Sequence, residues 1–207
     1  MPLVIFMRHG QAENNVNRML VGRHLESHLT EYGRQQAADA AKHLKGVRVD
    51  KVLVSPVIRA VETAKIVCDE IGAEYEIDER LYEIELGKLV GMNFEEVVIK
   101  HGNLFLKFYD EHDPILDSFG VEPFSEVKKR ITSLLDDAAD KHSDRNVLCV
   151  THLDPIKAAI STILELKPEA LYRWHIRNAA LTVLKQQDKI YSLSAVNVMS
   201  MHRYPNE

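Results

Sequence analysis

The stretch Leu3-Val4-Ile5-Phe6-Met7-Arg8-His9-Gly10 runs from five apolar residues directly into an arginine, a histidine and a glycine. An apolar run of this length is too short for a helix and is typical of a strand that is buried on both faces. Further short runs of β-branched or aliphatic residues predict the remaining strands, at residues 52–54, 147–150, 181–184 and 190–196. The sequence therefore predicts a central sheet of buried strands.

Segments with helical periodicity lie between these runs. Small and apolar residues recur on one face of each segment at spacings of three and four. The three stripes are Ala37, Ala40, Ala41 and Leu44 after Thr30; Ala60, Ala64, Val67 and Ile71; and Val127, Ile131, Leu134 and Ala138. Ser55-Pro56 and Asp154-Pro155 each place a capping side chain before a proline, which predicts two helix starts directly after strands. This alternation predicts a three-layer α/β/α sandwich with a mostly parallel central sheet.

Residues 92–124 interrupt the alternation and contain five of the six phenylalanines of the chain. We interpret this segment as an inserted helical cap whose phenylalanines serve mainly to pack it against the sheet. The alternative is that they line an apolar pocket that selects a larger phosphomonoester. The sequence contains no internal repeat, low-complexity tract or linker rich in Gly, Ser or Pro. We therefore expect one domain that covers residues 1–207.

The composition limits the classes of function. The chain has 207 residues, 45% of them hydrophobic, and a formal net charge of -5, which gives no general attraction for nucleic acid or an anionic membrane. Cys68 and Cys149 lie in apolar segments and predict buried thiols without redox or metal chemistry. There is no basic leader, and no stretch approaches the ~18 apolar residues of a membrane span. We expect a cytoplasmic protein without nucleic-acid or membrane partners.

Reactive side chains follow three of the predicted strands. Arg8 and His9 follow the first strand, Arg59 comes after the second, and His152 follows the strand at residues 147–150. The carboxyl ends of parallel strands meet at one edge of a sheet, so we expect these side chains to converge there. Guanidinium groups match phosphate oxygens with a rigid fork of donors, and a neutral histidine can act as a nucleophile near pH 7. Each residue alone is weak evidence, but together they predict a site for a phosphate dianion.

Four ordered blocks of sequence can be compared with a known family. The blocks are Arg8-His9-Gly10-Gln11 with Asn15; Ser55-Pro56 with Arg59-Ala60 and Thr63-Ala64; Leu81 with Glu83, Gly87 and Gly91; and Val150-Thr151-His152. They resemble the histidine phosphatase superfamily, the group that includes the cofactor-dependent phosphoglycerate mutases. The likeness extends over almost the whole chain, including Gly120-Val121-Glu122 and Asn178.

The resemblance implies a role for each residue at the strand ends. His9 is the implied nucleophile, and Arg8, Arg59 and His152 are implied to clamp the oxygens of the phosphoryl group. Glu83 matches the acidic position that protonates the leaving oxygen and then activates the water that hydrolyses the phosphohistidine. No metal is implied, because the arginines and the second histidine can supply the charge stabilisation that Mg²⁺ gives to other phosphoryl-transfer enzymes.

Five further positions match places where the family contacts phosphate or substrate. They are Asn15, Gln11, Gly22, Arg23 and Leu153. The resemblance implies that Asn15 adds a contact near the phosphate and that Gly22 and Arg23 lie in a substrate loop. For Arg23, a solvated surface charge is the competing interpretation.

The sequence departs from the family pattern near the second histidine and in the first block. Leu153 stands where the family usually has glycine, so its side chain must turn away from the pocket or narrow it. Asp154 comes next, and we interpret it as a helix N-cap, because a carboxylate that faced the phosphate would repel it. Ala12 replaces a small hydroxyl residue and removes one hydrogen bond. These changes affect the fit of the substrate more than the class of reaction.

Hydrolysis is favoured over isomerisation. A mutase needs extra cations for a substrate that carries both a phosphate and a carboxylate. Here the segment after Glu83 lacks the tyrosine typical of mutases, and the cap contains Lys100 and Lys107 but no arginine. We therefore predict a metal-independent phosphatase that needs no cofactor and acts on a small phosphorylated metabolite.

Two alternatives stay open. The first is a phosphoglycerate mutase, an isomerase that would use 2,3-bisphosphoglycerate as a primer. The second is a non-catalytic phosphate-binding regulatory protein, which the joint presence of His9, His152, Arg8, Arg59 and Glu83 argues against. The sequence does not fix the natural substrate or the oligomeric state, and a homodimer is compatible with it.

Overall fold

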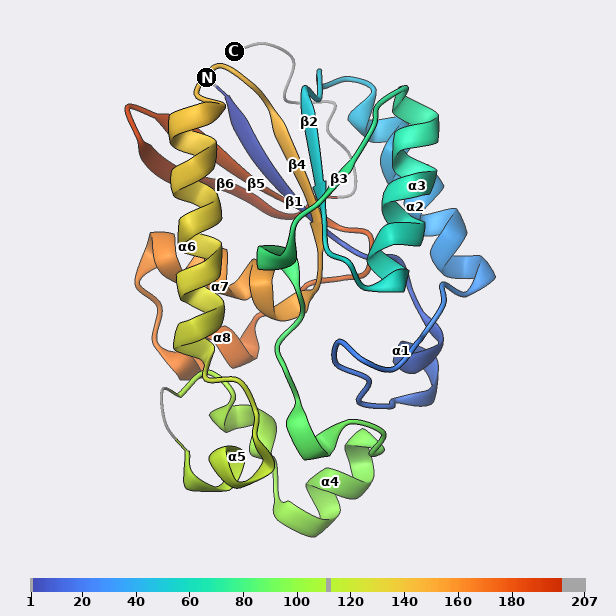
Figure 1. Cartoon of the computed structure of the whole chain (residues 1–207), viewed down its shortest axis with the longest axis vertical. Coiled ribbons are helices and arrows are strands. Elements are labelled where there is room, and N and C mark those ends of the chain that lie inside the picture. Colours follow the sequence, from blue (N-terminus) through green and yellow to red (C-terminus); the bar gives the residue numbers. More distant parts are fainter. Residues whose placement is uncertain (1, 111–112, 199–207) are drawn as a thin grey trace.

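A six-stranded sheet forms the centre of the molecule, with its strands in the order β3-β2-β4-β1-β5-β6. The computed structural model describes residues 2–110 and 113–198 (Figure 1). The strands are β1 Leu3–Arg8, β2 Lys51–Val54, β3 Glu76–Ile77, β4 Val147–Thr151, β5 Leu181–Gln187 and β6 Ile190–Val198. β1 to β4 run parallel, and β5 is antiparallel to both of its neighbours. The predicted mostly parallel sheet is confirmed. The two-residue strand β3 is too short for an alternating pattern to reveal it.

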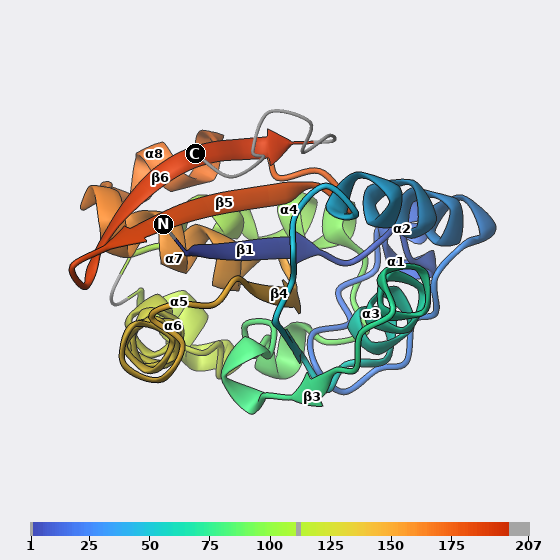
Figure 2. The ribbon, with the colours of Figure 1, turned by 90° about the horizontal axis from the view of Figure 1, so that it is seen from above.

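Helices cover both faces of the sheet, and Figure 2 shows the resulting layers from above. The α-helices are α1 Glu13–Asn17, α2 Glu31–Leu44, α3 Ile58–Ile71, α4 Phe94–His101, α5 Pro114–Phe119, α6 Phe124–Lys141, α7 Leu153–Leu164 and α8 Pro168–Arg173, and the 3-10 helices are η1 Glu79–Leu81, η2 Gly87–Leu89 and η3 Leu104–Lys107. Successive side chains of a strand point to opposite faces. Ile5 therefore packs with residues of α2 and α3, whereas Phe6 packs with residues of α6 and α7. This arrangement is the predicted α/β/α sandwich.

Two predicted helix starts are wrong in detail. The N-cap of α3 is Val57, and the N-cap of α7 is His152, so neither Ser55 nor Asp154 caps a helix. The Ser55 hydroxyl instead lies 2.8 Å from Nε2 of His152, and Asp154 is buried in the first turn of α7. Both polar side chains therefore belong to the interior at the sheet edge.

The cap lies beyond the carboxyl ends of the parallel strands, at the lower end of Figure 1, and contains α4, η3 and α5. Phe108 and the first residue of α6, Phe124, are buried in the same core cluster as Phe6 of the sheet. The cap therefore packs against the sandwich, as the sequence predicts. Phe94 and Phe105 are only partly buried, which leaves part of their rings for another role.

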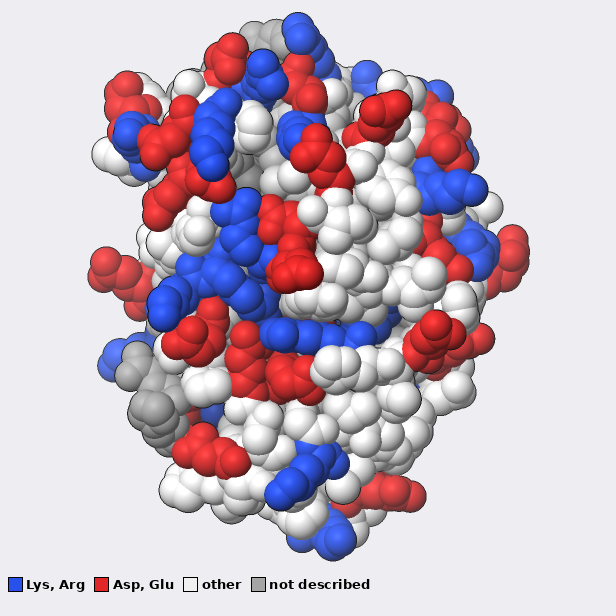
Figure 3. Space-filling model, in the orientation of Figure 1, with Lys and Arg blue, Asp and Glu red and all other residues white. Residues whose placement is uncertain are grey.

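The surface mixes charges of both signs. On the face drawn in Figure 3, a band of basic side chains crosses the middle of the molecule and is bordered by acidic ones. Within the two described ranges, each helix is too short or too polar to span a bilayer.

Candidate active site

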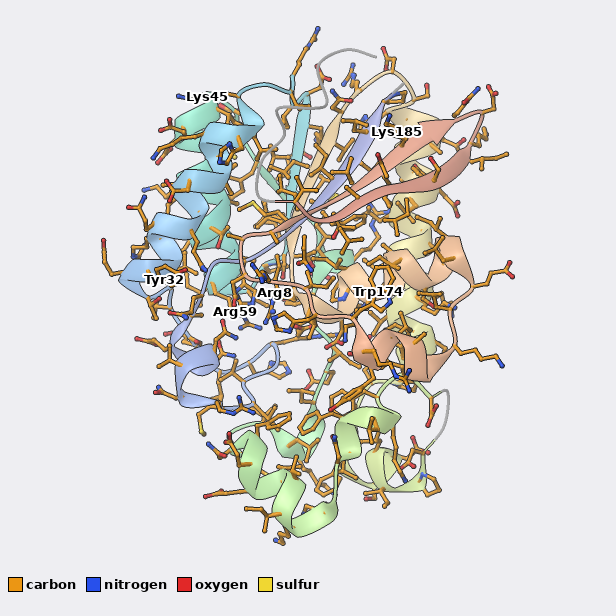
Figure 4. The ribbon with its side chains drawn as sticks, turned by 180° about the vertical axis from the view of Figure 1, so that it is seen from behind. Arg8, Tyr32, Lys45, Arg59, Trp174 and Lys185 are labelled. Atoms are coloured by element: carbon orange, nitrogen blue, oxygen red, sulfur yellow. The ribbon has the colours of Figure 1, made fainter. Side chains whose placement is uncertain are left out.

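Three segments meet at the carboxyl edge of the sheet, as expected for residues that follow parallel strands. Arg8 pairs with Thr151 in the register of β1 and β4. His9 and His152 each come directly after one of these paired residues, so they leave neighbouring strands side by side. Arg59 reaches the same place from the first turn of α3. Figure 4 shows Arg8 and Arg59 close together between the sandwich and the cap. The structure thus brings together the two arginines and two histidines that the sequence singles out.

His9 is held in one tautomer by its own loop. Nδ1 of the ring lies 2.7 Å from the carbonyl oxygen of Gly10, which can only accept a hydrogen bond, so Nδ1 carries the proton. Nε2 then has a lone pair, and it accepts a hydrogen bond from Nε of Arg59 at 3.2 Å. Burial, together with the charges of Arg59 and Arg8, lowers the pKa of His9 well below its usual value. The ring is therefore neutral near pH 7, as a nitrogen nucleophile must be.

His152 lies beside His9, with the ring centroids 5.2 Å apart. Its Nε2 is 2.8 Å from the hydroxyl of Ser55, whereas its Nδ1 is buried without a partner among the described residues. If Ser55 donates to Nε2, the ring proton resides on Nδ1. Burial and the nearby positive charges lower the pKa of His152 well below its usual value. An anion bound beside the ring would raise this pKa again.

In each of the two arginines, one guanidinium nitrogen donates a hydrogen bond to a backbone carbonyl and another has no hydrogen-bond partner among the described residues. Arg8 donates to the carbonyl of Ile176 at 2.5 Å, and Arg59 donates to the carbonyl of Gly22 at 3.0 Å. Nε of Arg8 and Nη1 of Arg59 are buried and have no hydrogen-bond partner within the described part of the chain. Burial lowers the pKa of Arg59 to about 10, which leaves it charged at neutral pH. Two cations with buried, unused donor atoms form a site for an oxyanion.

Glu83 lines the cavity between the sheet edge and the cap, as Arg8 and Arg59 do. One carboxylate oxygen accepts hydrogen bonds from the backbone N–H groups of Ile84 at 3.0 Å and Asp154 at 3.2 Å. Burial and the adjacent carboxylate of Asp154 raise the pKa of Glu83 to about 7, against the opposing charges of Arg59 and Arg8. Near neutral pH the group can therefore both give and take a proton.

A buried chain of polar groups continues from Asp154. Its Oδ1 accepts a hydrogen bond from the hydroxyl of Tyr109 at 2.9 Å, and Nζ of Lys157 donates to the same hydroxyl at 2.8 Å. Burial lowers the pKa of Lys157 and raises that of Tyr109. The sequence reasoning did not identify Tyr109 or Lys157. A signal for Lys157 existed, because it is the one basic residue in helix α7, whose side chains are mostly apolar.

Asn15, Gly22 and Leu153 line the cavity, as their predicted role requires. Oδ1 of Asn15 accepts hydrogen bonds from the backbone of Ala12 and from Nδ2 of Asn178, which leaves its NH₂ group as a donor. The partly buried Leu153 contributes to the wall, so it narrows the pocket rather than turning away.

Gln11 and Arg23 are not among the residues that line the cavity. Oε1 of Gln11 accepts a hydrogen bond from the hydroxyl of Thr30 at 2.9 Å. Arg23 donates to the carbonyl of Glu83 at 2.6 Å and pairs with the carboxylate of Glu122 at 2.5 Å. It is therefore not a solvated surface charge either, but a support for the loop that carries Glu83.

The cavity between the sheet edge and the cap has a volume of about 740 Å³. Polar residues of the site form one part of its lining: Arg8, Asn15, Arg59, Glu83, Asp154, Lys157 and Asn178. Large apolar and aromatic side chains form much of the rest: Met19, Leu20, Ile84, Leu86, Phe94, Phe105, Phe108, Tyr109, Leu153, Tyr172 and Trp174. The cavity can thus hold an anionic head and an apolar body.

Among the described residues, no group of three or more His, Cys, Asp or Glu side chains could hold a metal ion. His24 and His28 are four residues apart, a spacing that two metal ligands on a helix would have. Nε2 of His24 instead lies 2.7 Å from a carboxylate oxygen of Glu85, and Nδ1 of His28 lies 2.9 Å from one of Glu62. Cys68 and Cys149 are free and buried, as expected.

Comparison with known proteins identifies relatives over nearly the full chain. The model of the histidine phosphatase superfamily (branch 1) matches residues 4–199. The 2,3-bisphosphoglycerate-dependent phosphoglycerate mutase of Thermoplasma acidophilum is 34% identical over 210 residues, which cover 100% of this chain and 99% of the relative. Phosphoserine phosphatase 1 of Hydrogenobacter thermophilus is 26% identical over 198 residues, which cover 94% and 92% of the two chains. The crystal structure of phosphoserine phosphatase from Entamoeba histolytica in complex with 3-phosphoglyceric acid has a TM-score of 0.82 and 28% identity, and the match covers 96% of this chain and 98% of that one.

Proposed function

Because this chain belongs to the histidine phosphatase superfamily (branch 1), we propose that it hydrolyses small phosphomonoesters through a phosphohistidine formed at His9. Its relatives include proteins named as phosphatases and as a mutase, and both names describe enzymes of phosphoryl transfer. The arrangement of side chains at the sheet edge supports hydrolysis as the reaction of this chain.

The observation that carries the proposal is a set of unpaired polar atoms around His9. Nε of Arg8, Nη1 of Arg59 and Nδ1 of His152 are buried and lack hydrogen-bond partners within the described residues. An unsatisfied buried donor costs ~1–3 kcal/mol, and more when it is charged. The oxygens of a phosphoryl group are acceptors for the two arginine donors, and for Nδ1 of His152 when that atom carries the ring proton, so we assign these residues to phosphate binding. The NH₂ group of Asn15 is placed to add a fourth donor.

The first half-reaction forms the phosphohistidine. The lone pair on Nε2 of His9 attacks phosphorus, and the bond between phosphorus and the ester oxygen breaks. The leaving oxygen takes the proton of the Glu83 carboxyl group, whose pKa of about 7 keeps a protonated fraction at neutral pH. The hydrogen bond from Nδ1 of His9 to Gly10 stabilises the positive charge that develops on the ring.

The second half-reaction restores the enzyme. The Glu83 carboxylate removes a proton from a water molecule that attacks the phosphorus of the phosphohistidine. The N–P bond breaks, its electron pair returns to Nε2 of His9, and inorganic phosphate leaves. Arg8 and Arg59 stabilise the charge on the phosphoryl oxygens in both steps, so we propose catalysis that is independent of a metal.

Phosphoglycerate mutase activity is the second candidate, because the Thermoplasma acidophilum relative that is 34% identical carries that name. The cap residues speak against it. Lys107 is paired with Asp113 at 2.6 Å, and neither Lys107 nor the exposed Lys100 lines the cavity. The cations that a mutase needs for a second acidic group are therefore not supplied from the cap.

The two candidate functions differ in the molecule that accepts the phosphoryl group from the phosphohistidine, which is water in a phosphatase and a phosphoglycerate in a mutase. Incubation with 3-phosphoglycerate and catalytic 2,3-bisphosphoglycerate, followed by assays for free phosphate and 2-phosphoglycerate, separates them. Hydrolysis predicts free phosphate without the isomer, whereas rapid appearance of 2-phosphoglycerate would make the chain a mutase. His9→Ala must lose activity on p-nitrophenyl phosphate. Phosphate binding without any turnover by the wild-type chain would instead support a regulatory protein.

We also propose a cytoplasmic location, which the buried free thiols of Cys68 and Cys149 support.

A further inference from the structure

The part of the cavity contributed by the cap contains a row of three aromatic rings. Phe94 and Phe105 are stacked with their centroids 4.3 Å apart, and Phe105 and Phe108 are tilted with centroids 4.9 Å apart. All three side chains line the cavity. Trp174 lines it as well, two residues before the Ile176 carbonyl that anchors Arg8, and Figure 4 draws it level with Arg8. Ring faces and edges in this number favour an aromatic ligand.

The volume of the cavity exceeds what a short metabolite needs. About 740 Å³ lies within the range of ~300–1,000 Å³ of pockets that hold drug-sized ligands. A phosphate group with a three-carbon body would leave most of this volume, and most of the apolar wall, in contact with water. An apolar leaving group would remove that wall from water and gain binding free energy in proportion to the buried area.

The charges of the lining argue against an acidic leaving group. Beyond the phosphate clamp, the carboxylates of Glu83 and Asp154 face the cavity. Lys157 is committed to the hydroxyl of Tyr109, and Arg18 pairs with Glu95. Glu83 is protonated when it acts as the acid, so a carboxylate on the leaving group would meet the negative charge of Asp154 near the reacting phosphorus.

Arg173 also lines the cavity, from the last turn of α8. Its side chain is exposed, so an ion pair there would be worth little in water. Neither Arg18, which pairs with Glu95, nor the exposed Arg173 therefore offers a carboxylate on the leaving group a strong ion pair.

We propose that the preferred substrates are phosphomonoesters of alcohols that carry an uncharged aromatic group, with that group held against Phe94, Phe105, Phe108 and Trp174. This inference rests on the proposed function, because Arg8 and Arg59 must hold the phosphoryl group while the rings hold the leaving group.

The test compares phosphate esters of primary alcohols, so that the basicity of the leaving oxygen stays nearly constant. The series is 2-phenylethyl phosphate, n-propyl phosphate, 3-(phosphooxy)propanoate and the methyl ester of the last compound. We expect kcat/KM for 2-phenylethyl phosphate to exceed that for n-propyl phosphate by at least about tenfold. The methyl ester should be a better substrate than the free acid, because it removes the negative charge and adds only one methyl group.

A matched pair of variants on α4 tests the ring. Phe94→Ala removes a side chain that lines the cavity, whereas Ile99→Ala changes a side chain that is 84% exposed. We expect Phe94→Ala to lower kcat/KM for 2-phenylethyl phosphate about tenfold and to leave that for n-propyl phosphate nearly unchanged. Ile99→Ala should change neither value. Phe94→Leu, which keeps apolar volume without the ring, should lie between wild type and Phe94→Ala.

The outcomes separate this inference from the proposed function. Equal kcat/KM for the phenyl and propyl esters, or a preference for the free acid, would overturn the inference while hydrolysis itself stands. Equal losses on both esters in Phe94→Ala would also overturn it, because the ring would then only support the fold. Absence of hydrolysis for every ester would instead refute the proposed function.

Discussion

Nε of Arg59 donates a hydrogen bond to Nε2 of His9 across 3.2 Å, while the opposite nitrogen of the same ring lies 2.7 Å from the carbonyl of Gly10. The two contacts fix the plane and the tautomer of the imidazole. They also direct the lone pair of Nε2 toward the cations that are proposed to bind phosphate. When a phosphoryl group enters, the Arg59 donor can pass from the ring to a phosphate oxygen, which frees the lone pair for attack.

Arg59→Lys tests whether the fork of the guanidinium matters more than its charge. Lysine keeps the positive charge but loses the donors that reach His9 and Gly22 together. We expect kcat/KM for p-nitrophenyl phosphate to fall about 100-fold to 1,000-fold, the usual loss when an oxyanion donor is removed. Arg48→Lys, at an exposed side chain, is the matched control and should behave as wild type. Full activity of Arg59→Lys would refute the assigned role.

Glu83→Gln tests the proposed proton donor by its dependence on the leaving group. The amide keeps the shape of the carboxyl group but cannot protonate the leaving oxygen. Hydrolysis of an alkyl phosphate should fall by about 100-fold to 10,000-fold. Phosphorylation by p-nitrophenyl phosphate, measured as the burst of nitrophenol, should fall much less because nitrophenolate leaves without a proton. An equal loss with both substrates would contradict the role of Glu83 as a general acid.

Asp154→Asn tests the electrostatic coupling inside the cavity. The Asp154 charge helps to raise the pKa of Glu83 to about 7, while Arg59 and Arg8 oppose it. Removing one negative charge favours the ionised form of Glu83, so its pKa must fall. For an alkyl phosphate, the loss of kcat/KM with rising pH should therefore occur at lower pH than in wild type.

The control for this pH profile is Asp69→Asn, at an exposed position of α3. It removes the same charge far from the site and should leave the profile unchanged. The second ionisation of the substrate affects all three proteins equally. If kcat/KM of Asp154→Asn falls with rising pH at the same pH as in wild type, Asp154 does not affect the pKa of Glu83.

Gly33→Ala tests how the loop after β1 is held. A Cβ at Gly33 would collide with the backbone carbonyl of Gln11, two residues after the nucleophile. We expect a loss of about 1–3 kcal/mol in the free energy of unfolding, together with reduced activity. Gly46→Ala is the matched control, because its Cβ would meet only a carbonyl oxygen at 3.8 Å. Thermal unfolding should show a lower Tm for Gly33→Ala than for Gly46→Ala, and equal Tm values would contradict the close approach.

Much of the fold could be predicted because the strands are buried on both faces. The continuous apolar run at residues 3–7 predicts a strand in the interior of the sheet. The stripe at Ala60, Ala64 and Val67 predicts the buried face of α3. The predicted caps were wrong because a serine or aspartate before proline satisfies the same local pattern whether it caps a helix or bonds elsewhere. Ser55 bonds to His152, a contact 97 residues away in sequence that local reasoning does not detect.

The positions of the site residues could be predicted only where a strand end fixes them. Arg8, His9 and His152 follow from the register of two adjacent strands. Tyr109 could not be predicted, because its contact with Asp154 depends on how the cap folds back over α7. The same holds for Arg23, whose pairing with Glu122 brings two distant loops together.

The most direct test of the central claim is to trap the covalent intermediate. The wild-type chain is mixed with p-nitrophenyl phosphate, quenched in alkali within the first turnover and digested, and the peptides are analysed by mass spectrometry. We expect one added phosphoryl group on the peptide that contains His9, stable in alkali, lost in acid, and absent from His9→Ala. Phosphorylation of any other residue, or burst turnover without a phosphorylated His9, would contradict it.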